Sequence, residues 1–270
     1  MNRIIGKNAQ LRKDGKKAFV AYITAGFPNL KTTKQLVTIL EKSGTDFVEL
    51  GMPFSDPVAD GQTIQYSSSV ALKKGMTVHK FLSLVKILRR STQIPLIMMS
   101  YYNPILKFGI DKFARTAASC GLDGVIVPDL PPEEARQFNK ALKQEGILQI
   151  FLISPVTEPQ RIRKIVNISR GFVYYVTLTG VTGARDKLPD DLARHLRSVK
   201  RVTKTPVFAG FGISRPQQVR RIIRVVDGVI VGSAIISIIR KYHGKKDFGK
   251  KVRTYITSMS TAAHESGAGL

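Results

Sequence analysis

The chain has 270 residues, 43% of them hydrophobic and 23% charged, which suits one folded domain with a large core and excludes a disordered chain. Because Cys120 is the only cysteine, the sequence excludes an internal disulfide and a cysteine cluster for zinc or iron and sulfur. The formal net charge of +24 favours anionic substrates and partners, but the cations are scattered without interleaved aromatic residues, so we expect no nucleic-acid function.

Short β-branched runs recur along the chain, and they alternate with turns and with amphipathic helix patterns. The predicted strands, in chain order, are residues 18–24, 46–51, 95–100, 124–128, 148–153, 172–177, 206–210 and 228–232. Helix patterns with apolar residues three and four apart include residues 30–43, 132–145, 158–168, 190–202 and 216–225. Such alternation predicts a parallel sheet.

Eight units of this kind predict a closed (β/α)8 TIM barrel in the α/β class, with residues 1–270 forming a single domain. An open doubly wound sheet uses the same local units and is the alternative, although no GxGxxG follows the first strand. In a barrel, catalytic residues lie at the carboxyl ends of the strands, and phosphate often binds the loops after strands seven and eight. We therefore expect the functional residues at these positions.

The second predicted strand carries a carboxylate close to its carboxyl end. Strand alternation sends Val48 and Leu50 to one face and Phe47 and Glu49 to the other, so we expect Glu49 to point into the barrel mouth. Partial burial would raise the pKa of this carboxyl toward neutrality, where it could both donate and accept protons. The alternative is a structural Glu49, bonded to a neighbouring backbone amide or cation.

The loop that follows this strand, residues 51–61 (GMPFSDPVADG), is long and rich in turn residues. It carries two more carboxylates, Asp56 and Asp60, and loops of this kind commonly position functional groups. Three acids in one strand and its loop favour a pair that divides acid, base and electrostatic roles, because different environments separate their pKa values.

Two glycine-containing turns follow the seventh and eighth predicted strands. They read AGFGIS at residues 209–214 and VGSAI at residues 231–235, and both precede helix-forming sequence. Glycines let backbone N–H groups approach an anion, and the amino end of the following helix adds a positive dipole. The pair therefore predicts a phosphate-binding cup, with simple tight turns as the alternative.

The segment ELGMPFSDPVADG, residues 49–61, resembles the signature of the tryptophan synthase alpha chain family. The resemblance covers nearly the whole chain, through FVAYITAG at 19–26, SYYNP at 100–104, VPDLP at 127–131, GVTGAR at 180–185 and both glycine turns. It implies a TIM-barrel lyase of tryptophan biosynthesis. The implied reaction is the retro-aldol cleavage of indole-3-glycerol phosphate to indole and glyceraldehyde 3-phosphate.

Roles for single residues follow from this resemblance. Glu49 is implied to be the catalytic acid and base, Asp60 to engage the indole nitrogen, and Tyr174 to lie beside the catalytic glutamate. The segment 178–188 resembles a loop that closes over the site. The implied substrate-binding residues are Tyr22, Tyr101 and Phe211 around the indole, Gly183, Gly212, Gly232 and Ser233 around the phosphate, and Thr182 in the closing loop.

A partner is also implied by the resemblance. It is the β chain of tryptophan synthase, which carries pyridoxal phosphate and receives indole in an α2β2 heterotetramer, whereas this chain is expected to hold no cofactor and no metal. Pro53, Asp56, Asp129 and Pro131 correspond to positions where the family meets that partner, although Pro and Asp are also common in turns. The excess positive charge suggests that the partner offers an acidic surface.

The chain departs from the family pattern at Phe27, where an acidic residue is common, at Gln62, where many members have Pro, and at Thr177, where Ser is usual. All three departures leave the catalytic carboxylates in place. The alternatives to the lyase of a two-chain enzyme are a regulatory subunit that cleaves nothing, a freestanding lyase without a partner, and another phosphosugar barrel enzyme or a nucleic-acid binder.

Export and membrane insertion are not expected. Residues 1–17 lack the apolar core of a secretory signal. The longest apolar run, 225–239, is interrupted by Asp227 and falls short of the roughly 18 to 20 residues that a membrane span needs. We expect a cytoplasmic protein, or one of the plastid stroma if the source is a photosynthetic eukaryote.

Overall fold

The computed structural model describes residues 1–176, 190–210 and 212–265, and within these ranges one parallel sheet has the strand order β5-β4-β3-β2-β1-β9-β8-β7-β6. The strands are β1 (Ala18–Thr24), β2 (Phe47–Gly51), β3 (Leu96–Met99), β4 (Gly124–Ile126), β5 (Leu148–Ile150), β6 (Leu152–Ile153), β7 (Val173–Val176), β8 (Val207–Gly210) and β9 (Gly228–Val231). The helices are α1 (Arg3–Lys13), α2 (Leu30–Lys42), α3 (Gln62–Lys73), α4 (Val78–Arg89), α5 (Tyr102–Phe108), α6 (Ile110–Cys120), α7 (Arg136–Gln144), α8 (Pro159–Ile168), α9 (Asp190–Arg201), α10 (Pro216–Ile222), α11 (Ser233–Tyr242) and α12 (Phe248–Glu265).

One interrupted strand closes this sheet into a barrel. Phe151 alone separates β5 from β6, and β5 pairs with β4 whereas β6 pairs with β7. The single strand predicted at residues 148–153 therefore supplies both edges of the sheet, and the chain itself joins them. The predicted TIM barrel is confirmed, and the open doubly wound sheet is wrong. Each predicted strand begins and ends within two residues of the strand that the structure describes.

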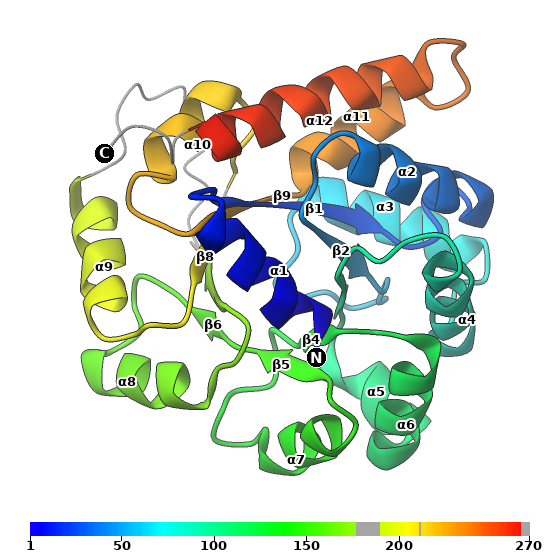
Figure 1. Ribbon diagram of the computed structural model, residues 1–270. Coiled ribbons are helices and arrows are strands. Elements are labelled where there is room, and N and C mark those ends of the chain that lie inside the picture. The colour runs from blue at the N-terminus through cyan, green and yellow to red at the C-terminus, as the bar shows by residue number, and fades with distance from the viewer. Residues whose placement is uncertain (177–189, 211, 266–270) are drawn as a thin grey trace.

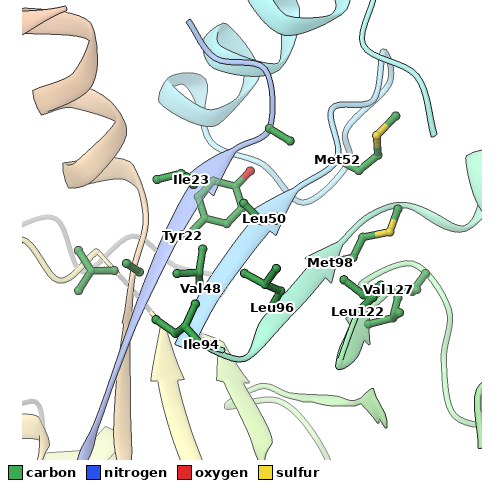
Figure 2. Close-up of a cluster of buried hydrophobic side chains, with 14 of the residues drawn as sticks. Tyr22, Ile23, Val48, Leu50, Met52, Ile94, Leu96, Met98, Leu122 and Val127 are labelled. Carbon is green, nitrogen blue, oxygen red and sulfur yellow. The ribbon is translucent and has the colours of Figure 1, made fainter. Parts of the chain in front are cut away.

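Alternate strand residues face opposite layers, as the period of two requires. Figure 1 shows the helices surrounding the strands, and Figure 2 shows part of the apolar layer between them, where Val48 and Leu50 of β2 pack near Leu96 and Met98 of β3. The opposite faces of the strands fill the barrel interior with a second cluster that includes Val20, Phe47, Ile97, Ile126, Phe172, Phe208 and Ile230. No helix in the described part of the chain is long and apolar enough to cross a membrane.

Helix α1, absent from the predicted helices, covers the amino-terminal end of the barrel (Figure 1). Its Ile4 and Leu11 join the interior cluster. Asn8 ties the helix to the chain before β7, because its Nδ2 donates to the Gly171 carbonyl at 2.8 Å. Helix α1 therefore covers the apolar cluster inside the barrel at its amino-terminal end.

Three aspartates fix the strands at this amino-terminal end. Asp46, Asp123 and Asp227 each precede a strand, and each makes two hydrogen bonds with one residue of another strand. The backbone N–H of the aspartate donates to the carbonyl of that residue, and the carboxylate of the aspartate accepts the N–H of the same residue. The partners of Asp46, Asp123 and Asp227 are Phe19, Leu96 and Val207, with 2.9, 2.8 and 2.9 Å between the backbone nitrogen and the carboxylate oxygen. Each carboxylate also contacts a cationic or imidazole side chain: His264 for Asp46, Arg3 and Arg89 for Asp123, and Lys17 and Lys200 for Asp227. These interactions stabilise the amino-terminal end of the barrel, opposite to the carboxyl ends of the strands where the functional residues are expected.

Candidate active site

Glu49 lies in the barrel mouth on β2, in register with Tyr22 of the neighbouring β1. Its side chain is buried, and neither carboxyl oxygen has a hydrogen-bond partner among the residues that the structure describes. Burial, and then the nearby charge of Asp60, raise the pKa of Glu49 to about 8. The carboxyl is therefore not engaged by an amide or cation there, and it can hold a proton at neutral pH and give it up.

Asp60 follows on the loop after β2 and is half-buried. Burial raises the pKa of Asp60, whereas a hydrogen bond with the Tyr101 hydroxyl lowers it. Gln65 fixes the backbone here, because its Nε2 donates to the Asp60 carbonyl at 2.7 Å. Asp60 and Glu49 thus lie in different environments, as two acids with divided roles require.

Tyr101, predicted as a wall of the indole slot, also holds the Asp60 loop. Its hydroxyl oxygen accepts the Ala59 N–H at 2.9 Å, and its ring stacks on Phe54 with 5.2 Å between the ring centroids. Burial raises the pKa of Tyr101 to about 12, so the hydroxyl stays protonated at neutral pH and can donate to Asp60. The spacing of the loop residues gave no signal for this second role.

Two buried tyrosines rest their hydroxyls on glycines at strand ends. A Cβ on Gly51 would lie 2.1 Å from the Tyr22 hydroxyl oxygen, and one on Gly210 would lie 2.5 Å from the Tyr174 hydroxyl oxygen. Burial, and smaller contributions that include the charge of Glu49, raise the pKa of both tyrosines, so both keep their phenolic protons. Gly51 and Gly210 were not predicted as site residues, since a strand-end glycine normally signals a turn.

The two predicted phosphate turns lie side by side, because β8 pairs with β9. Gly212 has φ +51°, a conformation that favours glycine, and Gly232 precedes α11. The side chain of Gln218 already binds the two backbone amides before α10, at 2.9 and 3.1 Å. Among the described residues no side chain caps the amino end of α11, which begins at the exposed Ser233, so this end is the better anion site of the two.

The remaining predicted residues divide into two groups. Phe211, Thr182, Gly183 and the segment 178–188 lie outside the described residues, as does Thr177. Of the four predicted partner-interface residues, Asp56 and Asp129 are exposed, Pro131 is half-buried and Pro53 is buried. The Asp129 carboxylate accepts the Tyr102 N–H at 3.0 Å and so fixes the chain after β3.

Within the described ranges, no group of three His, Cys, Asp or Glu side chains is arranged to hold a metal ion. The site instead combines a protonated buried acid, a second carboxylate and an uncapped helix end along one barrel mouth. Such a set can anchor an anionic substrate, protonate it and stabilise the cation that forms.

Comparisons with known proteins agree on one family. The family described as tryptophan synthase alpha chain matches residues 8–264. The chain is 49% identical over 244 residues to the tryptophan synthase alpha chain of Geotalea uraniireducens (strain Rf4), with 90% of this chain and 91% of that protein covered. It is 44% identical over 262 residues to the one from Geobacter sulfurreducens, with 97% and 99% covered.

Solved structures agree with this finding. The crystal structure of tryptophan synthase subunit alpha from Legionella pneumophila str. Paris has a TM-score of 0.90 and 37% identity, with 97% of this chain and 98% of that chain covered. A chain of the aminoacrylate-bound tryptophan synthase of M. tuberculosis has a TM-score of 0.87 and 30% identity, with 98% and 100% covered.

Proposed function

The chain belongs to the tryptophan synthase alpha chain family, and from that premise we propose that Glu49 is its catalytic acid and base and Asp60 its ring-stabilising carboxylate. Its reaction is that of the family, the lyase cleavage of indole-3-glycerol phosphate to indole and glyceraldehyde 3-phosphate in tryptophan biosynthesis. The observation that carries the assignment is the buried carboxyl of Glu49, which has no hydrogen-bond partner in the described part of the chain and whose pKa of about 8 keeps its proton available at neutral pH.

The proposed steps move one proton from a substrate hydroxyl to carbon 3 of the ring by way of Glu49, which ends as protonated as it began. Glu49 gives its proton to carbon 3 of the indole ring, and the Asp60 carboxylate stabilises the positive charge that spreads to the ring N–H. The ionised Glu49 then takes the proton of the hydroxyl on the adjoining glycerol carbon. The carbon–carbon bond breaks, its electron pair returns to the ring, and indole and the aldehyde separate while Glu49 again carries a proton.

Substrate orientation follows from the two ends of the site. We propose that the phosphate binds the uncapped amino end of α11 together with Gly212, Gly232 and Ser233, and that Gly183 and Thr182 complete this end. The indole ring then lies between Tyr22, Tyr101 and Phe211, and Tyr174 lies beside Glu49. Anchoring the phosphate brings carbon 3 to the acid, which converts binding energy into orientation.

Chains of this family act with a β partner. We propose an α2β2 assembly in which the β chain holds pyridoxal phosphate and receives the indole, and in which Pro53, Asp56, Asp129 and Pro131 form part of the contact. Three exposed apolar side chains support a contact at this end of the barrel, because all follow the carboxyl ends of strands. They are Val58 after β2, Leu106 after β3 and Val156 after β6, with 83, 53 and 77% of their surface exposed.

Alpha chains of this family need no cofactor of their own. The similarity to bacterial alpha chains over nine-tenths or more of the sequence supports the further proposal that the chain is a single barrel domain and works in the cytoplasm.

The test is to measure indole release from indole-3-glycerol phosphate with and without an added β chain. Glu49→Gln removes the acid, and Glu145→Gln makes the same change at an exposed position. We expect release that rises with the β chain and is lost in Glu49→Gln alone. Strong release that the β chain does not change would favour a freestanding lyase, and release that survives in Glu49→Gln would overturn the assignment of the acid.

A further inference from the structure

A chain of three buried hydroxyls connects the barrel mouth to helix α3. The Tyr22 hydroxyl lies 3.5 Å from Thr24 Oγ1, and Thr24 Oγ1 lies 2.6 Å from Ser67 Oγ. Ser67 Oγ in turn donates to the Ile64 carbonyl at 2.8 Å. Thr24 and Ser67 are 1% and 0% exposed, so the chain is shielded from water and its hydrogen bonds are made within the protein.

The last acceptor sets the direction of this chain. A backbone carbonyl only accepts, so the Ser67 proton is used on Ile64. Ser67 Oγ then accepts the Thr24 proton, and Thr24 Oγ1 accepts the Tyr22 proton, because each hydroxyl has a single proton to donate. The opposite direction would make one hydrogen bond fewer. The Tyr22 proton is thus directed to Thr24, which leaves the lone pairs of the Tyr22 oxygen free to accept a hydrogen bond.

Tyr22 spans the distance between the two ends of the site. Its ring lies beside Gly232, where an added Cβ would be 3.3 Å from the ring Cδ1, and its hydroxyl lies over Gly51, two residues after Glu49. Figure 2 shows the ring lying between β1 and β2. The part of the substrate that connects the phosphate to the reacting carbon is the glycerol, so the glycerol must pass alongside Tyr22.

We propose that the Tyr22 hydroxyl oxygen accepts a hydrogen bond from a glycerol hydroxyl of the substrate, and that Thr24 and Ser67 are positioning residues that hold it as an acceptor. The inference rests on the substrate orientation proposed above. It assigns a polar role to a side chain that, as a wall of the indole slot, would need only its ring. It also assigns a role to α3, which begins two residues after Asp60.

Tyr22→Phe tests the proposal, because it removes the hydroxyl and keeps the ring. We expect kcat/KM for indole-3-glycerol phosphate to fall about tenfold. The inhibition constant of an indole alkyl phosphate that lacks the glycerol hydroxyls is expected to stay within about twofold, because this ligand offers nothing for the oxygen to accept. Ser68→Ala is the matched control, because Ser68 is a buried serine of α3 that takes no part in the hydrogen bonds between Tyr22, Thr24 and Ser67. We expect kcat/KM and the inhibition constant to stay unchanged in this variant.

A double-mutant cycle tests the positioning role. Thr24→Val keeps the shape of the side chain and removes the acceptor, so we expect a loss of about threefold in kcat/KM that disappears in the Tyr22→Phe background. Equal losses for substrate and inhibitor in Tyr22→Phe would reduce Tyr22 to packing and overturn the proposal, as would no loss or additive effects of the two substitutions. Failure of the reaction itself would be visible separately, as absence of indole release from the unaltered chain with a β chain.

Discussion

Replacing Glu49 with glutamine is expected to stabilise the fold while it removes the activity. In the unfolded chain this carboxyl has its ordinary pKa of 4.5, whereas burial raises the pKa to about 8 in the folded chain. Between these values the folded chain must keep a proton that the unfolded chain releases. The free energy of unfolding therefore falls as the pH rises from 4.5 to about 8, and it levels off above that range.

The size of this effect follows from the two pKa values. Compared with a chain that has a neutral side chain of the same shape at this position, the free energy of unfolding is lower by about 1 kcal/mol at pH 5, about 3 kcal/mol at pH 7 and about 5 kcal/mol at pH 9. Glutamine is such a side chain. The stability gained by Glu49→Gln should therefore widen with pH by these amounts, while the rate of cleavage falls by about 10²-fold to 10⁴-fold.

Urea unfolding of both chains at the three pH values measures the difference directly. Glu145→Gln serves as the control, because an exposed glutamate should show no gap at any of these values. A constant difference in the free energy of unfolding between Glu49→Gln and the unaltered chain from pH 5 to pH 9, or a less stable variant, would contradict the raised pKa of Glu49. Either result would mean that the Glu49 carboxyl ionises in the folded chain much as it does in water.

Three further predictions concern the loop after β2, the amino-terminal end of the barrel and the net charge. Tyr101→Phe removes the acceptor of the Ala59 N–H and the hydrogen bond that lowers the pKa of Asp60, so the acid limb of the kcat/KM profile should move to higher pH; an unmoved limb would contradict this role. Arg89→Met leaves the buried Asp123 with one cation fewer and should lower the free energy of unfolding by about 3 kcal/mol with kcat unchanged, whereas a lower kcat would mean that the two barrel ends are coupled. The net charge of +24 predicts that the Kd for the β chain rises several-fold with ionic strength in titration calorimetry, and a Kd that salt leaves unchanged would argue against an acidic partner surface.

Much of the fold could be predicted from the sequence because its signals are local. A period of two and a period near four can be counted along the chain, and they indicate strands and helices without knowledge of distant contacts. The same alternation correctly sends Glu49 inward and Val48 outward, since neighbouring strand residues face opposite sides. The family resemblance then supplied the roles of Glu49 and Asp60, which periodicity alone left open.

The barrel decided the rest, because it brings together residues that are far apart in the chain. Thr24 and Ser67 are 43 positions apart, and only the packing of α3 against β1 joins their hydroxyls. The glycine at position 210 makes room for Tyr174 of another strand, which no local pattern could indicate. The sequence alone therefore indicates the strands and the face that each strand residue takes, but not helix α1 or the break in the strand at residues 148–153. The hydrogen-bond partners, the burial and the raised pKa of Glu49 depend on the tertiary structure, because they arise from neighbours that the chain order does not specify.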